Sequence, residues 1–147
     1  MRSAGLLPYR LDAQLEVLIA HPGGPWFAKK DAGSWSVIKG IVKDDEGDRD
    51  AAVREFEEET GWQVPDTNWI SLGETTLKSR KVVVAWAIEA DFDITSFHPG
   101  TFSLYGREYP EIDRVVWTAS DVAREKLNPA QRVFIDRLAA ELVSLDK

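Results

Sequence analysis

The chain contains no cysteine among its 147 residues. A disulfide framework, a thiolate metal site and thiol-based catalysis are therefore excluded. The sequence also has no apolar run close to the roughly 20 residues that span a bilayer, and its opening residues lack the continuous apolar core of a signal peptide. We expect a cytoplasmic protein that does not associate with a membrane.

Positive charge is scarce relative to negative charge, with 18 lysine and arginine residues against 25 aspartate and glutamate residues and a net charge of −7. Nine of the acidic residues, but only three of the basic ones, fall within residues 40–62. The rest of the chain is nearly neutral, and it offers no basic patch for a nucleic acid polymer or an anionic membrane. The acidity is concentrated in one segment, and we expect a site there.

Alternation of apolar and polar residues predicts the strands of the fold. The expected strands are residues 3–10, 14–22, 35–40, 68–77, 81–91 and 112–119. Glycine, proline and adjacent charges predict a loop over residues 23–35 and an irregular segment over 92–110, which would form a lid or a rim. The first two strands are expected to form a hairpin.

Two helices are expected in the C-terminal part of the chain. The shorter one follows Ser120, and the longer one follows Asn128, which can cap it, with Pro129 at the first helical position. Strands interspersed with helices in a chain of this length predict one α/β domain over residues 1–147. Its mixed sheet would be covered by helices on its faces.

Residues 50–60 contain neither glycine nor proline and stop at Gly61, the residue type that most often follows a helix C-terminus. A helix there would hold Glu55, Glu58 and Glu59 within about 100° of arc, and like charges at this spacing each cost a few tenths of a kcal/mol. A divalent cation would remove the repulsion, because hard cations take carboxylate oxygens. The alternative is a solvent-exposed face of helix-forming glutamates.

The spacing of the whole segment is more specific than its glutamates alone. Gly40 is followed after five residues by Glu46 and, after seven more, by REFEEETGW at residues 54–62. This segment resembles the Nudix box, G-x5-E-x7-R-E-U-x-E-E-x-G-U with U a bulky apolar residue, at every defined position. The chain is thus similar to the Nudix hydrolases. The resemblance implies their α/β/α sandwich with a central mixed sheet, and hydrolysis of a nucleoside diphosphate linked to another group.

The resemblance also implies roles for individual residues. The metal ligands would be Glu55, Glu58 and Glu59. The ion would be Mg²⁺, with Mn²⁺ as a substitute, and Arg54 would orient its ligands. Gly40 would let the backbone approach the diphosphate closely, because it has no Cβ. Glu46 would support the loop or contact the metal from outside.

The general base of Nudix enzymes varies between a box glutamate and a carboxylate outside the box. Glu58 is the first candidate here. Glu108 and Glu111 are the candidates outside the box because they flank the irregular segment, and an equal alternative is that they are ordinary charges on its rim. The two histidines of the chain, His21 and His98, are expected to be incidental.

Lysines and aromatic residues near the box are candidates for substrate contacts. Lys39 and Lys30 could meet phosphate oxygens, although surface lysines also fit the pattern. Four aromatic residues fall in loops where a nucleobase could stack: Trp26, Trp35, Phe102 and Tyr105. Three tryptophans fall in strands, where we expect them to pack in the core: Trp69, Trp86 and Trp117.

The sequence leaves more than one substrate class open. The Lys39–Gly40 pair before the box and the C-terminal helical pattern resemble the group that cleaves nucleoside or dinucleoside polyphosphates. Ile38 stands where many of those relatives have a proline, so the loop is expected to be less rigid. An ADP-ribose or nucleotide-sugar pyrophosphatase, and a nucleotide-binding domain without turnover, are the other readings. In each the partner is a small-molecule nucleotide.

Overall fold

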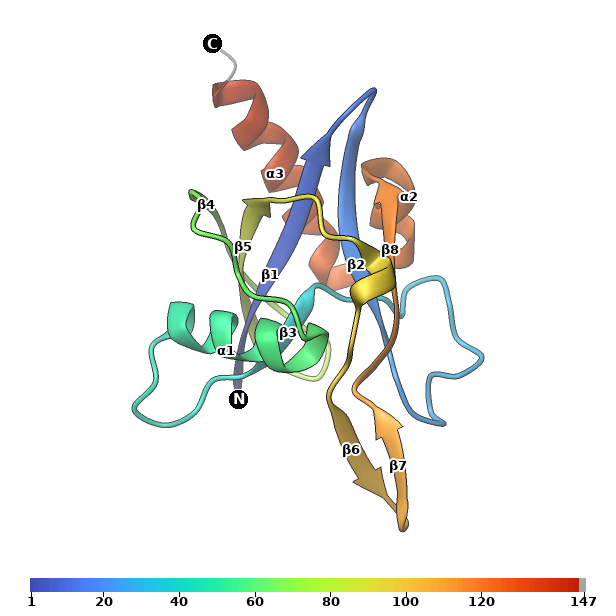
Figure 1. Ribbon diagram of the computed structural model, residues 1–147. Helices are drawn as coiled ribbons and strands as arrows, with labels where there is room; N and C mark the ends of the chain where they lie inside the picture. Colours follow the sequence, from blue (N-terminus) through green and yellow to red (C-terminus); the bar gives the residue numbers. More distant parts are fainter. Residues whose placement is uncertain (146–147) are drawn as a thin grey trace.

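Strand β1 (Arg2–Leu11) lies in the middle of the sheet in the computed structural model, which describes residues 1–145 (Figure 1). It runs antiparallel to β2 (Leu15–Pro22) and β3 (Ile38–Ile41), and parallel to β5 (Val82–Glu89). Residues 3–9 of β1 are all buried, because a central strand is covered on both faces and cannot expose alternate side chains. The predicted hairpin of β1 and β2 is confirmed.

The remaining sheet strands extend both sides of this centre. β4 (Trp69–Thr76) pairs with β5, and β8 (Ile112–Ala119) pairs with β2, which gives the order β4-β5-β1-β2-β8 with β3 beside β1. Parallel and antiparallel pairs occur together, so the predicted mixed sheet is confirmed. β3 is shorter than the predicted 35–40, because Trp35 and Ser36 form only isolated bridges with Leu127 and Ala20.

Residues 92–110 are more regular than predicted. A 3-10 helix, η1 (Ile94–Ser96), is followed by a hairpin of β6 (Thr101–Leu104) and β7 (Arg107–Pro110), which projects from the sheet (Figure 1). Its turn residues, Tyr105 and Gly106, have φ of 52° and 78°. Two-residue hairpin turns of this kind favour Asn-Gly or Asp-Gly. The turn was not recognised in the sequence because its first residue is a tyrosine.

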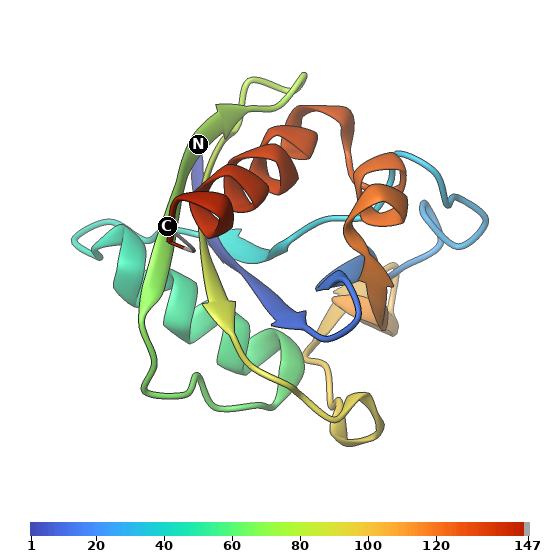
Figure 2. The same cartoon turned by 90° about the horizontal axis from the view of Figure 1, so that it is seen from above.

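Helices cover both faces of the sheet (Figure 2). α1 (Asp48–Thr60) packs on one face through Ala52 and Phe56. α2 (Ser120–Lys126), a 3-10 turn η2 (Pro129–Gln131) and α3 (Arg132–Leu145) cover the other face, where Phe134 and Leu138 are fully buried. The predicted α/β/α arrangement is confirmed. Within residues 1–145, no helix is long and apolar enough to cross a membrane.

The helix ends follow local chemistry that the sequence predicted. Gly61 follows α1 with φ 75°, and its N–H donates to the Glu57 carbonyl oxygen at 2.9 Å. Asn128 accepts a hydrogen bond from the Ala130 N–H at 3.1 Å and caps η2. α1 begins at Asp48, and Arg2 of β1 holds that residue with an ion pair of 2.7 Å.

A cluster of aromatic rings fixes α1 on the sheet. Phe56 is fully buried, with its ring centroid 5.3 Å from that of Phe92, and Trp62 stacks on Phe92 at 4.7 Å. Three partly buried tryptophans pack against the same core, as predicted: Trp69, Trp86 and Trp117. The helix that carries the box glutamates is therefore anchored by its apolar side.

Removing the Phe56 ring should test this anchoring. We expect Phe56→Ala to lower the free energy of unfolding by about 3–5 kcal/mol, because it leaves a cavity where α1 meets the sheet. Val53→Ala, on the half-buried side of the same helix, should cost about 1 kcal/mol or less. Urea unfolding followed by tryptophan fluorescence measures both, and equal losses would contradict the anchoring role.

Candidate active site

Gly40 and Glu55 form the contact on which the site is built. The glycine lies in β3, directly beside the first glutamate of the cluster on α1. A Cβ at position 40 would overlap the Glu55 carboxylate. Any other residue at position 40 would therefore displace this carboxylate from its place beside β3. Glycine in the motif leaves room for the Glu55 side chain here, in addition to the predicted approach of a phosphate.

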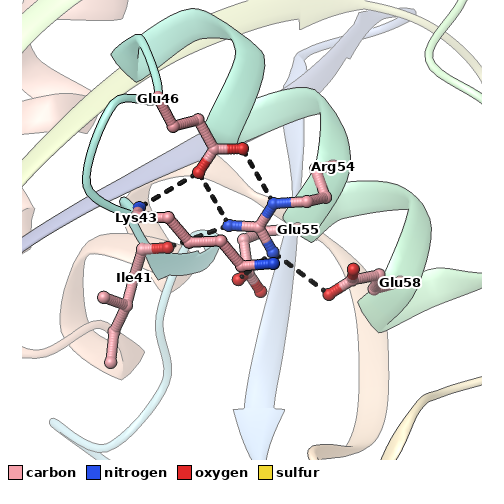
Figure 3. A network of polar contacts seen from close by, with 6 residues as sticks. All are labelled: Ile41, Lys43, Glu46, Arg54, Glu55 and Glu58. Atoms are coloured by element: carbon pink, nitrogen blue, oxygen red, sulfur yellow. Dashed lines mark hydrogen bonds and ion pairs between the residues drawn. The ribbon is translucent and has the colours of Figure 1, made fainter.

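Arg54 connects the acidic residues of this segment (Figure 3). Its guanidinium donates to Glu46 twice, at 2.8 and 2.9 Å, and to the Ile41 carbonyl oxygen at 3.0 Å. Its Nη1 donates to Glu55 at 2.7 Å and to Glu58 at 3.3 Å. The paired hydrogen bonds from Arg54 lower the pKa of Glu46 to about 2, because they favour the ionised carboxylate. Glu46 thus ties the loop after β3 to the helix.

A cavity of about 330 Å³ lies between β3, α1 and the start of β8. Three carboxylates line it, from Glu55, Glu59 and Glu111, together with Lys39 and Gly40. Two of these glutamates belong to the box, and the third is a candidate from outside it. The structure therefore joins the acidic helix to a residue from a distant part of the sequence.

Backbone hydrogen bonds hold Glu111 between β7 and β8. Its N–H donates to the Gly100 carbonyl oxygen at 2.8 Å, and its own carbonyl oxygen accepts from the Gly23 N–H at 2.9 Å. Glu108 is exposed on β7 and does not line the cavity. Of the two outside candidates, only Glu111 shares a cavity with the box glutamates.

The carboxylates of the cavity oppose one another's ionisation. Burial raises the pKa of Glu59 to about 8, with further contributions from the negative charges of Glu111, Glu55 and Glu58. Burial, followed by the charge of Glu55, also raises the pKa of Glu111. The pKa of Lys39 is lowered, chiefly by burial. The cavity holds more negative charge than its own side chains neutralise.

The donor set of this cavity fits a divalent cation. Carboxylate oxygens are the ligands that Mg²⁺ and Mn²⁺ prefer, and a cation would offset the repulsion that adds to burial in raising the pKa of Glu59. Within residues 1–145, no three side chains already converge as a finished metal site. Glu55 and Glu58 are instead turned toward Arg54, which takes the place of a counterion.

Glu58 lies apart from the cavity that Glu55 and Glu59 share. Its side chain is 56% exposed. It borders an outer hollow beside Arg54 and Glu57. The three predicted metal ligands therefore occupy one end of α1 but do not all point into one cavity.

A second cavity of about 480 Å³ adjoins the first, since Pro22, Ser36 and Lys39 line both. Phe27 and Lys30 of the loop 23–35 form part of its wall. The two lysines predicted to meet phosphate thus lie at cavity walls, Lys39 where the cavities adjoin and Lys30 in the second one.

Sequence reasoning missed two residues at the second cavity, Asn128 and Gln131. Gln131 is only 1% exposed; its side-chain oxygen accepts from the Val37 N–H at 2.9 Å and its amide donates to the Ser36 hydroxyl at 3.0 Å. The sequence offered no signal for this role, because the burial of Gln131 and its partners at residues 36 and 37 appear only in the fold.

The predicted aromatic candidates divide into two groups. Trp26 and Tyr105 are 71% and 92% exposed, and with Pro25 and Leu104 they border a surface hollow of about 250 Å³. Trp35 was predicted to be available for stacking; it forms part of the wall of the second cavity but is only 2% exposed in the core beneath α2, so its ring offers little surface to a base. Trp35 bridges to Leu127 and becomes part of the core there.

Phe102 was also expected in a loop, and this prediction is wrong. It lies in β6, where its ring packs on Tyr109 of β7 with centroids 5.9 Å apart. Its ring also closes over Gly24, where an added Cβ would lie 2.8 Å from the ring. Phe102 therefore joins the hairpin to the loop 23–35.

Comparisons with known proteins agree with this geometry. The model of the NUDIX domain family matches residues 1–138. A solved Ap4A hydrolase from C. elegans, in a binary complex, has 19% sequence identity and a TM-score of 0.74, with 97% of this chain and 98% of that chain covered. A comparison with curated proteins found no match.

Two further solved structures share the fold at similar identity. The NUDIX domain of Shewanella oneidensis NrtR, complexed with ADP ribose, is 15% identical over 97% of this chain and 88% of its own, with a TM-score of 0.64. A MutT protein from Methanosarcina mazei is 20% identical over 96% and 94%, with a TM-score of 0.63. These likenesses extend over nearly the whole chain.

The raised pKa of Glu59 predicts how stability depends on pH without metal. Between pH 4.5 and about 8 the folded protein retains a proton that the unfolded chain has released, so the free energy of unfolding falls as pH rises. We expect Glu59→Gln to remove this contribution and the exposed Glu57→Gln to keep it. Urea unfolding in a chelating buffer across this range measures the effect. Parallel curves for wild type and Glu59→Gln would contradict it.

Proposed function

This chain belongs to the Nudix hydrolases, and on that premise we propose that it is a metal-dependent pyrophosphohydrolase acting on a nucleoside or dinucleoside polyphosphate. The observation that carries the proposal is the shared cavity of Glu55, Glu59 and Glu111 beside the backbone of Gly40. It supports a reaction at a diphosphate. The diphosphate oxygens need backbone groups that approach them closely and positive charge that neutralises their own negative charge.

In this proposal Glu55, Glu58 and Glu59 hold the cation, which is Mg²⁺ with Mn²⁺ as a substitute. A bound divalent cation supplies positive charge against the phosphate oxygens and favours deprotonation of water. Arg54 is the residue that orients the ligands, since it already contacts Glu55 and Glu58. When the cation binds, these two carboxylates can exchange part of their contact with the guanidinium for metal ligation.

Glu111 is the general base that the geometry favours over Glu58. It lines the cavity with Glu55 and Glu59, whereas the Glu58 side chain is 56% exposed toward the outer hollow. Its pKa is raised by burial and by Glu55, which moves a carboxylate toward the range where it exchanges protons near neutral pH. Glu111 would accept the proton of the attacking water.

The second cavity is the place we propose for the nucleoside. Its volume of about 480 Å³ falls within the range of small-molecule sites. Lys39 lies where the two cavities adjoin and Lys30 at the wall of the second, so a polyphosphate chain passing between them meets positive charge. Phe27 offers an apolar surface in the same wall.

The hollow beside Trp26 and Tyr105 favours a substrate with a second base. Both rings are exposed and lie on segments that pack together, the loop 23–35 and the β6–β7 hairpin. Stacking on such rings is worth roughly 1–3 kcal/mol per base. A dinucleoside polyphosphate has a base for the second cavity and another for this hollow.

A substrate panel tests the proposed activity. Purified protein with Mg²⁺ should cleave dinucleoside polyphosphates or (d)NTPs in preference to ADP-ribose and nucleotide sugars, with products resolved by chromatography. Glu58→Gln should lower kcat by about 100-fold or more, because it removes a metal ligand, while the neighbouring Glu57→Gln should stay near wild type. Preference for ADP-ribose would overturn the substrate class. Metal and nucleotide binding without turnover would make the chain a binding domain.

A second pair of variants tests the general base. We expect Glu111→Gln to lower kcat by about 10²–10⁴-fold with the metal affinity unchanged, because a base acts on water and not on the ion. Glu108→Gln, the exposed neighbour on β7, should keep its activity. Metal affinity is measured by calorimetry and kcat by product formation. If Glu58→Gln kept the metal and lost turnover while Glu111→Gln stayed active, the base would be Glu58.

A further inference from the structure

His21, expected to be incidental, joins three separate segments of the chain. It lies at the end of β2, and its side chain is 0% exposed. Its Nδ1 is 2.7 Å from Asp113 Oδ1 on β8, and its Nε2 is 2.7 Å from the backbone carbonyl oxygen of Lys30 in the loop 23–35. The imidazole also meets the Trp35 ring edge to face, with centroids 5.1 Å apart.

The two polar contacts of His21 hold its ring from both edges. A carbonyl oxygen can only accept a hydrogen bond, so Nε2 of His21 donates to the Lys30 carbonyl oxygen. On the other edge, Nδ1 contacts Asp113, which Arg114 Nε approaches to 3.7 Å. The buried ring therefore joins β8 to the loop 23–35, and both of its polar atoms have partners.

Charged side chains surround the His21–Trp35 pair. On β8, Arg114 lies beside Asp113 and over the Trp35 ring, 5.3 Å from its centroid. From α2, Lys126 lies 5.2 Å from the same ring and pairs with Asp31 at 3.0 Å. Asp31 also accepts a hydrogen bond of 2.7 Å from the Trp35 indole N–H. Two carboxylates and two cations thus fix the surroundings of the histidine ring.

The Lys30 carbonyl is the point at which His21 holds the loop 23–35. Lys30 N–H donates to the Phe27 carbonyl oxygen at 2.9 Å, so the bond to His21 also fixes the turn that carries the Phe27 ring. The start of the loop is fixed separately, by the hydrogen bond of 2.9 Å between Gly23 N–H and the Glu111 carbonyl oxygen. Phe27 and Lys30 both line the second cavity.

We propose that His21 is a positioning residue for substrate binding. Its ring, held by Asp113, donates to the Lys30 carbonyl and sets the loop 23–35 as one wall of the second cavity. The role in substrate binding rests on the proposed function. The placement of the loop does not.

The first test uses the metal-free, substrate-free protein. Because the chain has two histidines, a long-range ¹H–¹⁵N spectrum contains two imidazole rings, and His98→Gln assigns them. We expect His21 Nε2 to carry a hydrogen, because the Lys30 carbonyl oxygen can only accept a hydrogen bond. An Nε2 without a hydrogen would overturn the proposal.

The second test asks whether His21 holds the loop. His21→Gln removes the ring that contacts both Asp113 and Lys30, so we expect faster amide hydrogen exchange across residues 24–34 and unchanged exchange in β6 and β7. Asp113→Asn, which removes the partner charge, should show the same pattern and serves if His21→Gln fails to fold. His98→Gln is the matched control. Unchanged loop exchange in a folded His21→Gln would overturn the proposal.

The third test separates positioning from chemistry. With the substrate that the wild type turns over, His21→Gln should raise KM about tenfold and change kcat by less than about threefold, because the loop contacts the bound nucleoside and not the reacting atoms. A loss confined to kcat would overturn the positioning role. If the wild type turned over no nucleotide, the proposed function would fail, and loop exchange would decide the placement of the loop by itself.

Discussion

Repulsion among the carboxylates of one cavity is the constraint that the surrounding elements have to satisfy. Glu55 and Glu59 come from α1 and Glu111 from between β7 and β8, and burial adds to the cost of ionising Glu59 and Glu111. Arg54 offsets part of this cost by contacting Glu55 and Glu58 while it holds Glu46. One guanidinium does not balance these five carboxylates, and burial together with their charges raises the pKa of Glu59. The site is therefore unfavourable by itself, and the proposed cation would complete it.

Packing on the opposite side of α1 supplies the stability that offsets the repulsion among these carboxylates. Ala52 and Phe56 are fully buried against the sheet, and the rings of Trp62 and Phe92 enclose Phe56. Arg2 anchors the first turn through Asp48. Residues at i and i+1 point in different directions on a helix, so an apolar stripe and an acidic stripe fit side by side. The helix can carry repulsive charge because its anchoring does not depend on that charge.

Local patterns were readable in the sequence because they depend on neighbours in the chain. The spacing from Gly40 to Trp62 gave the strand, the loop, the helix and its glutamates, and Gly61 gave the end of the helix. Which outside carboxylate joins them depends on the register of β8 and on the Gly23 contact. Neither feature can be read from the residues next to Glu111 and Glu108, so the sequence does not distinguish the two.

Long-range packing explains the predictions that failed. Trp35 lies among loop residues in the sequence, but its bridge to Leu127 draws it into the core beneath α2. Phe102 and Tyr105 belong to a hairpin whose turn has an unusual residue at a positive φ. His21 was set aside because one histidine in a strand carries little information, and its partners Asp113 and Lys30 are near it only in the folded chain. These contacts form only in the folded chain, so they could not be predicted from neighbouring residues in the sequence.

The distribution of charge also constrains how an anionic substrate reaches the site. A protein of net charge −7, with most of that charge around the box, repels a polyphosphate at long range. The lysines at the two cavities, Lys39 and Lys30, act only at short range because salt screens isolated charges beyond about 10 Å. Favourable association therefore needs the phosphate charge to be neutralised before or during entry. A divalent cation would serve both needs, since it relieves the carboxylates and makes the cavity attractive to phosphate.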